Sequence, residues 1–216
     1  MSTTYLNVVN KVLKRLRETE VTTVNENDYS ALIGEFVNDI KVEVENAWNW
    51  SALRNTLTIE TVVDTFNYEL TDSNVRMRIL DVYNDTQDFY MQAKPGMWFD
   101  QQFMKYDSVA KGAPAYYNFN GTSASGTVGV DVYPIPDDVY TLQLNVVLPM
   151  PELSSDNDIV YLPADILVAG AVSKAMEERG IDGGNQNAEL RYRLLLADYI
   201  SIDAALREDE ISWSAV

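Results

Sequence analysis

The hydrophobic period changes from two residues to helical spacing between residues 134 and 179, and this change constrains the fold more than any other feature. Residues 134–138, Pro-Ile-Pro-Asp-Asp, are rich in types that favour turns. Apolar and polar residues then alternate over residues 140–146, as in a half-buried strand. The prolines of residues 149–151 end this strand because proline cannot donate a ladder hydrogen bond. Pro163 then predicts the start of a helix, where its missing N–H costs nothing.

Four helices are expected, two on each side of a β-rich middle. Apolar residues recur at helical spacing in residues 5–16 and, as a wider stripe, in residues 29–48. After the middle, a helix rich in small residues is expected at 163–178, ended by Gly180 and then by Gly183-Gly184. A last helix carries a heptad-like seam that should pack on the first two helices or on a second copy. Its members are Ala188, Tyr192, Leu195, Tyr199, Ile202 and Leu206.

The middle of the chain has an apolar period of two. Turn-forming residues separate strand-like runs at residues 57–63, 66–70, 76–83, 89–91, 116–119, 126–132 and 141–147. Several short strands with such punctuation predict an antiparallel sheet, sandwich or barrel. We therefore expect an α+β protein, a split helical bundle with an antiparallel β domain inserted between its second and third helices. The expected helical domain is discontinuous, at 1–54 and 159–210, and the β-rich domain occupies 55–158.

Composition and charge limit the possible functions. The chain has a net charge of −17 at pH 7, no cysteine and no histidine. The missing types exclude disulfides, thiolate zinc sites and catalytic sets built on histidine. The acidic charge argues against a sequence-reading DNA-binding protein, although an acidic wall could enclose DNA and let it slide. The sequence shows neither a signal peptide nor a stretch of membrane-spanning length, which favours assembly in the cytosol.

Carboxylates and aromatic residues offer rival sites. Asp156 and Asp158, or Asp137 and Asp138, could belong to a calcium loop, but without the other ligands of such a loop we expect them to cap turns. A glycosidase needs only two carboxylates, yet no pair stands out. The aromatic residues of 90–119 could form a carbohydrate-binding or nucleic-acid-binding surface, although core packing is favoured. No catalytic, cofactor-binding or metal-binding residue is therefore assigned.

Two features of the N-terminal helices leave alternatives open. Lys11, Lys14 and Arg15 lie, with Arg17, in the one basic patch of an acidic chain. This patch is either a solvated helix face or a contact for an acidic neighbour. The Trp48-Asn-Trp50 sequence ends the second helix, and its two indoles either fill the core or form a stacking surface, with the core favoured.

The C-terminal residues depart from local rules. Glu208, Asp209 and Glu210 place negative charge at the end of a helix, where the helix dipole disfavours it. Ile211 and Trp213 then follow, apolar and with little chain left to fold back. This end is either frayed or a docking segment that becomes ordered on a partner with basic and apolar surface.

Taken in order, these motifs resemble those of head-to-tail adaptor (connector) proteins of tailed bacteriophages. The matching segments are Pro-Ile-Pro-Asp at 134–137, Tyr-Thr-Leu-Gln-Leu at 140–144, Pro-Met-Pro-Glu-Leu at 149–153, the acidic loop 156–158, and the Leu-Pro that opens the small-residue helix at 162–171. The N-terminal order of helix, polar break and long helix closing on Trp-Asn-Trp-Ser is also similar. It resembles the adaptor, or tail tubular protein A, of short-tailed phages.

The resemblance implies a virion protein that is not an enzyme and that forms a ring, usually of twelve copies, between the portal and the tail nozzle or tube. Such a ring extends the DNA channel for retention of packaged DNA and for ejection, and DNA passes through it without sequence-specific binding. No cofactor is implied.

The family also implies an orientation and a docking segment. The helices would face the portal and the β region the next tail component. By position, residues 208–216 would be a C-terminal docking tail that binds the portal, through Glu208, Asp209, Glu210, Ile211 and Trp213. The alternative functions are a glycan-binding β module of a virion or surface protein and, less favoured, a carboxylate-based cell-wall hydrolase.

Overall fold

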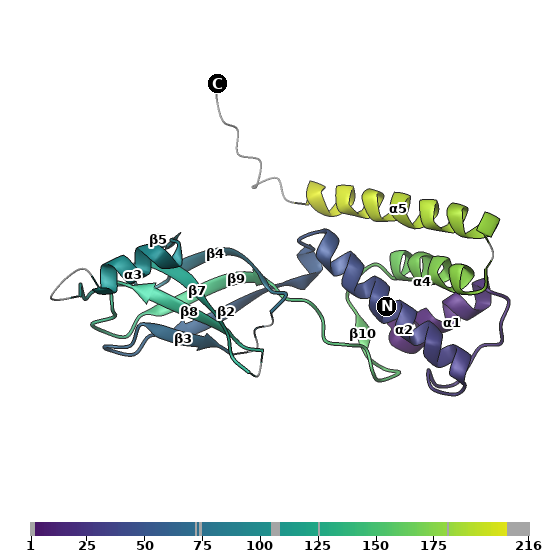
Figure 1. The fold of residues 1–216 in the computed structure, drawn as a ribbon, viewed down its shortest axis with the longest axis horizontal. Helices are drawn as coiled ribbons and strands as arrows, with labels where there is room; N and C mark the ends of the chain where they lie inside the picture. Colours follow the sequence, from purple (N-terminus) through teal and green to yellow (C-terminus); the bar gives the residue numbers. More distant parts are fainter. Residues whose placement is uncertain are drawn as a thin grey trace, which may run out of the picture. The chain divides into compact units, whose positions relative to one another are not determined.

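The chain is α+β, and its β-rich region is inserted between the second and third of the four expected helices, as the sequence predicted (Figure 1). The computed structural model describes residues 3–71, 73, 75–104, 109–124, 126–180 and 182–206. The chain divides into two compact units. The helical unit comprises Met1–Ala52 and Met150–Val216, and the β unit comprises Leu53–Pro149.

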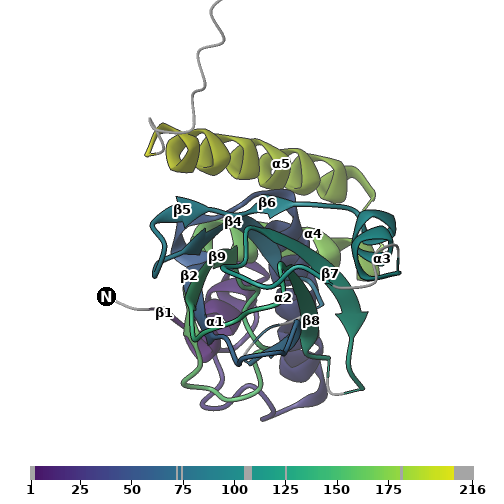
Figure 2. The ribbon, with the colours of Figure 1, turned by 90° about the vertical axis from the view of Figure 1, so that its left-hand side faces the viewer.

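The helical unit contains four helices in the part of the chain that the structure describes. These are α1 (Tyr5–Arg15), α2 (Asp28–Ala47), α4 (Ala164–Glu178) and α5 (Asp182–Ala205). A two-residue antiparallel ribbon joins β1 (Thr3–Thr4) to β10 (Ile159–Val160) and so ties the start of α1 to the segment before α4. α4 packs on α1 and α2, and α5 lies along α4 in both views (Figure 1, Figure 2).

The helix ends follow from local side chains. Asn27 caps α2: its side chain accepts a hydrogen bond from the Ser30 N–H at 2.8 Å, while the Ser30 hydroxyl accepts from the Asn27 N–H at 3.2 Å. Gly180 has a φ of 69° just after α4, the left-handed conformation that glycine tolerates best. The expectation that Gly183 and Gly184 also end this helix was wrong, because α5 already begins at Asp182.

Over its described residues, the β unit consists of two four-stranded sheets around one hydrophobic core. One sheet has the order β2 (Arg54–Glu60), β9 (Thr141–Val147), β4 (Arg78–Asn84), β5 (Phe89–Tyr90). The other has the order β3 (Asn67–Leu70), β8 (Val128–Tyr133), β7 (Tyr116–Thr122), β6 (Gln92–Ala93). All pairs are antiparallel except β6 with β7. Leu57, Val82 and Leu144 from the first sheet share the core with Leu70 and Val130 from the second.

The β unit also contains a helix, α3 (Gly96–Met104), that the sequence analysis did not anticipate. Phe99 of α3 is buried, and Trp98 packs against Tyr116 and Tyr133 with ring centroids 4.9 and 5.3 Å apart. The aromatic side chains therefore fold this short segment onto the second sheet. Because apolar residues also occupy its exposed positions, Met97 at 73% and Met104 at 83% exposed, the segment carries no clear helical period in the sequence.

Candidate binding surfaces of the helical unit

A row of three polar side chains on α2 fixes the chain where it returns from the β unit. The Asn38 amide binds both backbone groups of Leu153 at 3.0 Å. Lys41 donates to the Met150 and Pro151 carbonyls at 3.2 and 2.5 Å, and is only 2% exposed.

Glu45 completes the row, one turn further along α2. It is 1% exposed and its carboxylate accepts from the Met150 N–H at 2.9 Å. Spacings of three and four residues put Asn38, Lys41 and Glu45 on one face of the helix. Together they bind the backbone of residues 150–153. These residues belong to the helical unit, whereas the sequence analysis assigned them to a β-rich domain that ends at residue 158.

The acidic loop before α4 is held by hydrogen bonds to backbone N–H groups. Asp158 accepts from the Ser154 and Ser155 N–H groups, both at 2.8 Å, and these bonds lower the pKa of its carboxyl group. Asp156 accepts from the Val24 N–H at 2.9 Å. Both carboxylates thus cap turns, the role favoured from the sequence. Among the described residues, no cluster of three or more acidic side chains is placed to hold a metal ion.

The two indoles at the end of α2 are structural. Trp50 is 2% exposed and donates to the Val44 carbonyl at 2.7 Å. Trp48 donates to the Asp203 carboxylate of α5 at 2.9 Å, and the Ser51 N–H donates to the same carboxylate at 3.2 Å. Asp203 therefore ties the C-terminal half of α5 to the end of α2.

α5 is less covered than its heptad-like seam predicts. Instead of packing on α1 and α2, it packs mainly on α4, and Tyr192 is the seam residue with the deepest burial, at 8% exposed. Ile202 and Leu206, which belong to the same seam, are 60% and 74% exposed. Leu190 and Leu194 on another side of the helix are also more than half exposed. α5 thus offers apolar surface that the described part of the chain leaves open.

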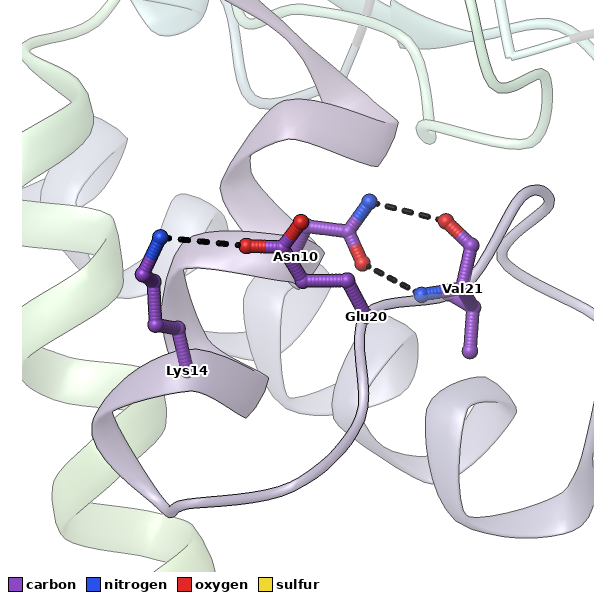
Figure 3. Close-up of polar contacts among 4 residues, drawn as sticks. All are labelled: Asn10, Lys14, Glu20 and Val21. Atoms are coloured by element: carbon purple, nitrogen blue, oxygen red, sulfur yellow. Dashed lines mark hydrogen bonds and ion pairs between the residues drawn. The ribbon is translucent and has the colours of Figure 1, made fainter.

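The basic patch of α1 is only partly neutralised by its own chain. The Asn10 amide binds both backbone groups of Val21, at 2.8 and 2.9 Å, and so folds the following loop back on α1 (Figure 3). This places Glu20 3.3 Å from the ammonium group of Lys14 (Figure 3). Arg15, one residue further, has no ion-pair or hydrogen-bond partner within the described ranges. The patch therefore keeps an open cation.

The aromatic residues of the β unit mostly contact one another. Phe66 lies 4.6 Å from Phe103, and Tyr117 lies 5.8 Å from Phe119, between ring centroids. With the contacts of Trp98 described above, these distances are those of aromatic packing. The arrangement favours a packing role over a glycan-binding surface.

The residues assigned to partner binding from the sequence are Glu208, Asp209, Glu210, Ile211 and Trp213. All five lie outside the described residues, so their role stays a proposal. In the helices that are described, none has the length and apolar composition needed to cross a bilayer.

These features define an α+β protein with a β unit inserted into a helical unit and with apolar and basic surface left open on the helices. The family model described as SU10 adaptor protein matches residues 3–215, so the chain belongs to this family of bacteriophage adaptor proteins. Membership indicates a structural component of the virion with a head-to-tail adaptor role. No curated protein matched the chain in the comparison.

Proposed function

We propose that this protein forms a ring between the portal and the tail nozzle or tube, and that this ring extends the DNA channel. The observation that carries the proposal is the family match, which spans both the helical and the β units rather than one of them. A structural role in a ring, usually of twelve copies in adaptors of this kind, needs no catalytic residues. The finer likeness to tail tubular protein A of short-tailed phages belongs to the same proposal.

The charge of the chain supports a role around DNA rather than on it. A net charge of −17 repels phosphates, and a wall that repels the duplex lets it slide during packaging and ejection. Virion location, assembly in the host cytoplasm and passage of DNA through the lumen are parts of this proposal.

The two units suggest that each contacts a different neighbour in the virion. We assign portal contact to the helical unit, with residues 208–216 as the docking tail, and nozzle contact to the β unit, Leu53–Pro149. Ile211 and Trp213 supply apolar side chains and Glu208, Asp209 and Glu210 supply charge for a basic and apolar cleft in the portal.

Reconstitution with the portal ring of the same phage tests the proposed function. Purified full-length protein is mixed with intact portal rings, and mass and shape are followed by light scattering and negative-stain microscopy. We expect a collar added to one face of each portal ring, whether or not the free protein is a monomer. A portal that stays bare at micromolar adaptor concentration would overturn the adaptor role for this chain.

A further inference from the structure

The helical unit has an apolar depression with two arginines at its rim, here named the arginine-rimmed depression. Its volume is about 390 Å³. Three helices contribute its lining: Arg15 from α1, Ala169, Val172 and Met176 from α4, and Asn187, Ala188 and Arg191 from α5. Ala169 and Val172 are buried, so the floor is apolar, whereas both arginines are exposed at its edge.

Both arginines lack a partner in the described part of the chain. Several other cations of this unit are paired: Lys14 lies 3.3 Å from Glu20, and the Arg179 guanidinium lies 2.6 Å from Glu18. Arg15 and Arg191 have no such carboxylate within the described ranges, although the chain carries 33 acidic residues against 16 basic ones. An apolar depression flanked by two open guanidinium groups suits a segment that combines apolar and acidic side chains.

The C-terminal end of α5 has this combination. Ile202 and Leu206 are 60% and 74% exposed. Asp198 is exposed, has no partner among the described residues, and precedes them at spacings of four, so all three lie along one stripe of the helix.

The two surfaces cannot meet within one molecule. Ala188 lines the depression near the start of α5, whereas Leu206 immediately follows its end. Eighteen residues of helix at 1.5 Å each separate them by roughly 27 Å, and a continuous helix cannot fold back on itself. Only a second copy can bring the stripe to the depression.

We propose that residues 198–206 of one copy dock into the arginine-rimmed depression of a second copy. Ile202 and Leu206 cover the apolar floor, and Asp198 faces Arg15 and Arg191 at its rim. Because the two surfaces are different patches of the molecule, the contact between copies is heterologous. Repeating it generates a closed ring when the rotations from copy to copy add up to a full turn. The inference rests on the proposed ring and supplies a contact between its neighbours.

Site-specific crosslinking tests this contact, and the absence of cysteine in the chain removes any background. Ala188→Cys and Leu206→Cys are made as separate full-length variants, mixed in equal amounts, and treated with a short bismaleimide. We expect a covalent dimer whose crosslinked peptides join positions 188 and 206. Both changes in one chain should instead give a ladder of longer oligomers. The matched control replaces Ala188→Cys by Asn25→Cys, an exposed loop position outside the depression.

Arg191→Glu reverses one rim charge and should lower the 188–206 crosslinking yield about fivefold, the size expected for an exposed charge pair, while circular dichroism confirms an intact fold.

A crosslinking yield no higher than that of the Asn25→Cys control, both in the free protein at high concentration and on the portal, overturns the contact. A collar without the crosslink would reject this contact and leave the adaptor role standing. A crosslink without a collar would support the contact and reject the portal role.

Discussion

At the residue scale, the buried charges of α2 explain how a chain interrupted by a β unit re-enters its helical unit in register. Lys41 and Glu45 are almost fully buried, and both bind backbone groups of Met150. Burying a charge is unfavourable unless it is paired and hydrogen-bonded, so these residues stabilise one placement of the returning segment and penalise others. The sequence places both within the apolar stripe of α2 but does not reveal their partners, which lie more than a hundred residues away.

Lys41→Met should therefore destabilise the protein by about 3 kcal/mol, because the Met150 and Pro151 carbonyls lose their donor and Glu45 stays buried. Urea unfolding followed by circular dichroism measures the change. Lys11→Met, on the exposed side of α1, is the control and should stay within about 0.5 kcal/mol of the parent. Equal stability of Lys41→Met and the parent would show that the buried hydrogen bonds contribute nothing.

A second residue-scale prediction concerns alkaline pH. Burial, with Glu43 nearby, raises the pKa of Tyr192 to about 12, against an ordinary value near 10. A raised folded-state pKa gives stability that is fully present below pH 10 and is lost as pH rises toward 12. Tyr192→Phe, which cannot ionise, should shift alkaline unfolding to higher pH. Far-UV circular dichroism between pH 9 and about 12.5 tests this, and Tyr161→Phe, at a 61% exposed position, should leave the transition unchanged.

At the element scale, the sequence predicted the long elements well and the short ones poorly. Four helices and strands such as β2, β4 and β9 were found because each repeats its period several times. β1, β6 and β10 have two residues each and carry no period, so only the folded chain reveals them. β5 is as short, and it was found only as part of the expected run 89–91. The arginine-rimmed depression was missed for a similar reason. The sequence showed a basic face on α1 and small residues on α4, but it did not show that these two helices meet at one depression.

The small residues of α4 set how closely it packs on α2. A Cβ added at Gly170 would lie 2.7 Å from Ile40 Cγ2, too close for ordinary contact. Gly170→Ala should thus lower the free energy of unfolding by about 1–2 kcal/mol, since overpacking outweighs the gain of about 1 kcal/mol in helix propensity.

Ile40→Ala provides the test of that steric cause. It removes the crowding methyl groups, so the double variant should be more stable than the sum of the two single changes predicts, by at least about 0.5 kcal/mol. Additive effects in urea unfolding would mean that Gly170 does not act through its contact with Ile40.

At the scale of the whole molecule, the acidic net charge and the open surfaces of the helices have different effects on binding. Net negative charge keeps copies apart and repels DNA, while local cations and apolar residues select particular neighbours. Charge and family resemblance could be obtained from the sequence alone. The unpaired state of Arg15 and Arg191 could not, because it depends on which carboxylates the fold places near each cation.

The docking tail provides the last prediction, which also belongs to this scale. Deleting residues 208–216 should leave the fold intact, because the described packing of α5 on α4 ends before this segment, but should weaken binding to the portal ring. Trp213→Ala in the full chain should weaken it by about tenfold if the indole fills an apolar cleft. The matched control, Ser214→Ala, alters a neighbouring position without removing an apolar side chain.

Co-sedimentation with portal rings at several salt concentrations gives the affinity, and the contribution of Glu208, Asp209 and Glu210 should shrink as salt screens their charge. A truncated protein that binds the portal as tightly as the full chain would remove the tail from the portal contact and leave that contact to the helices.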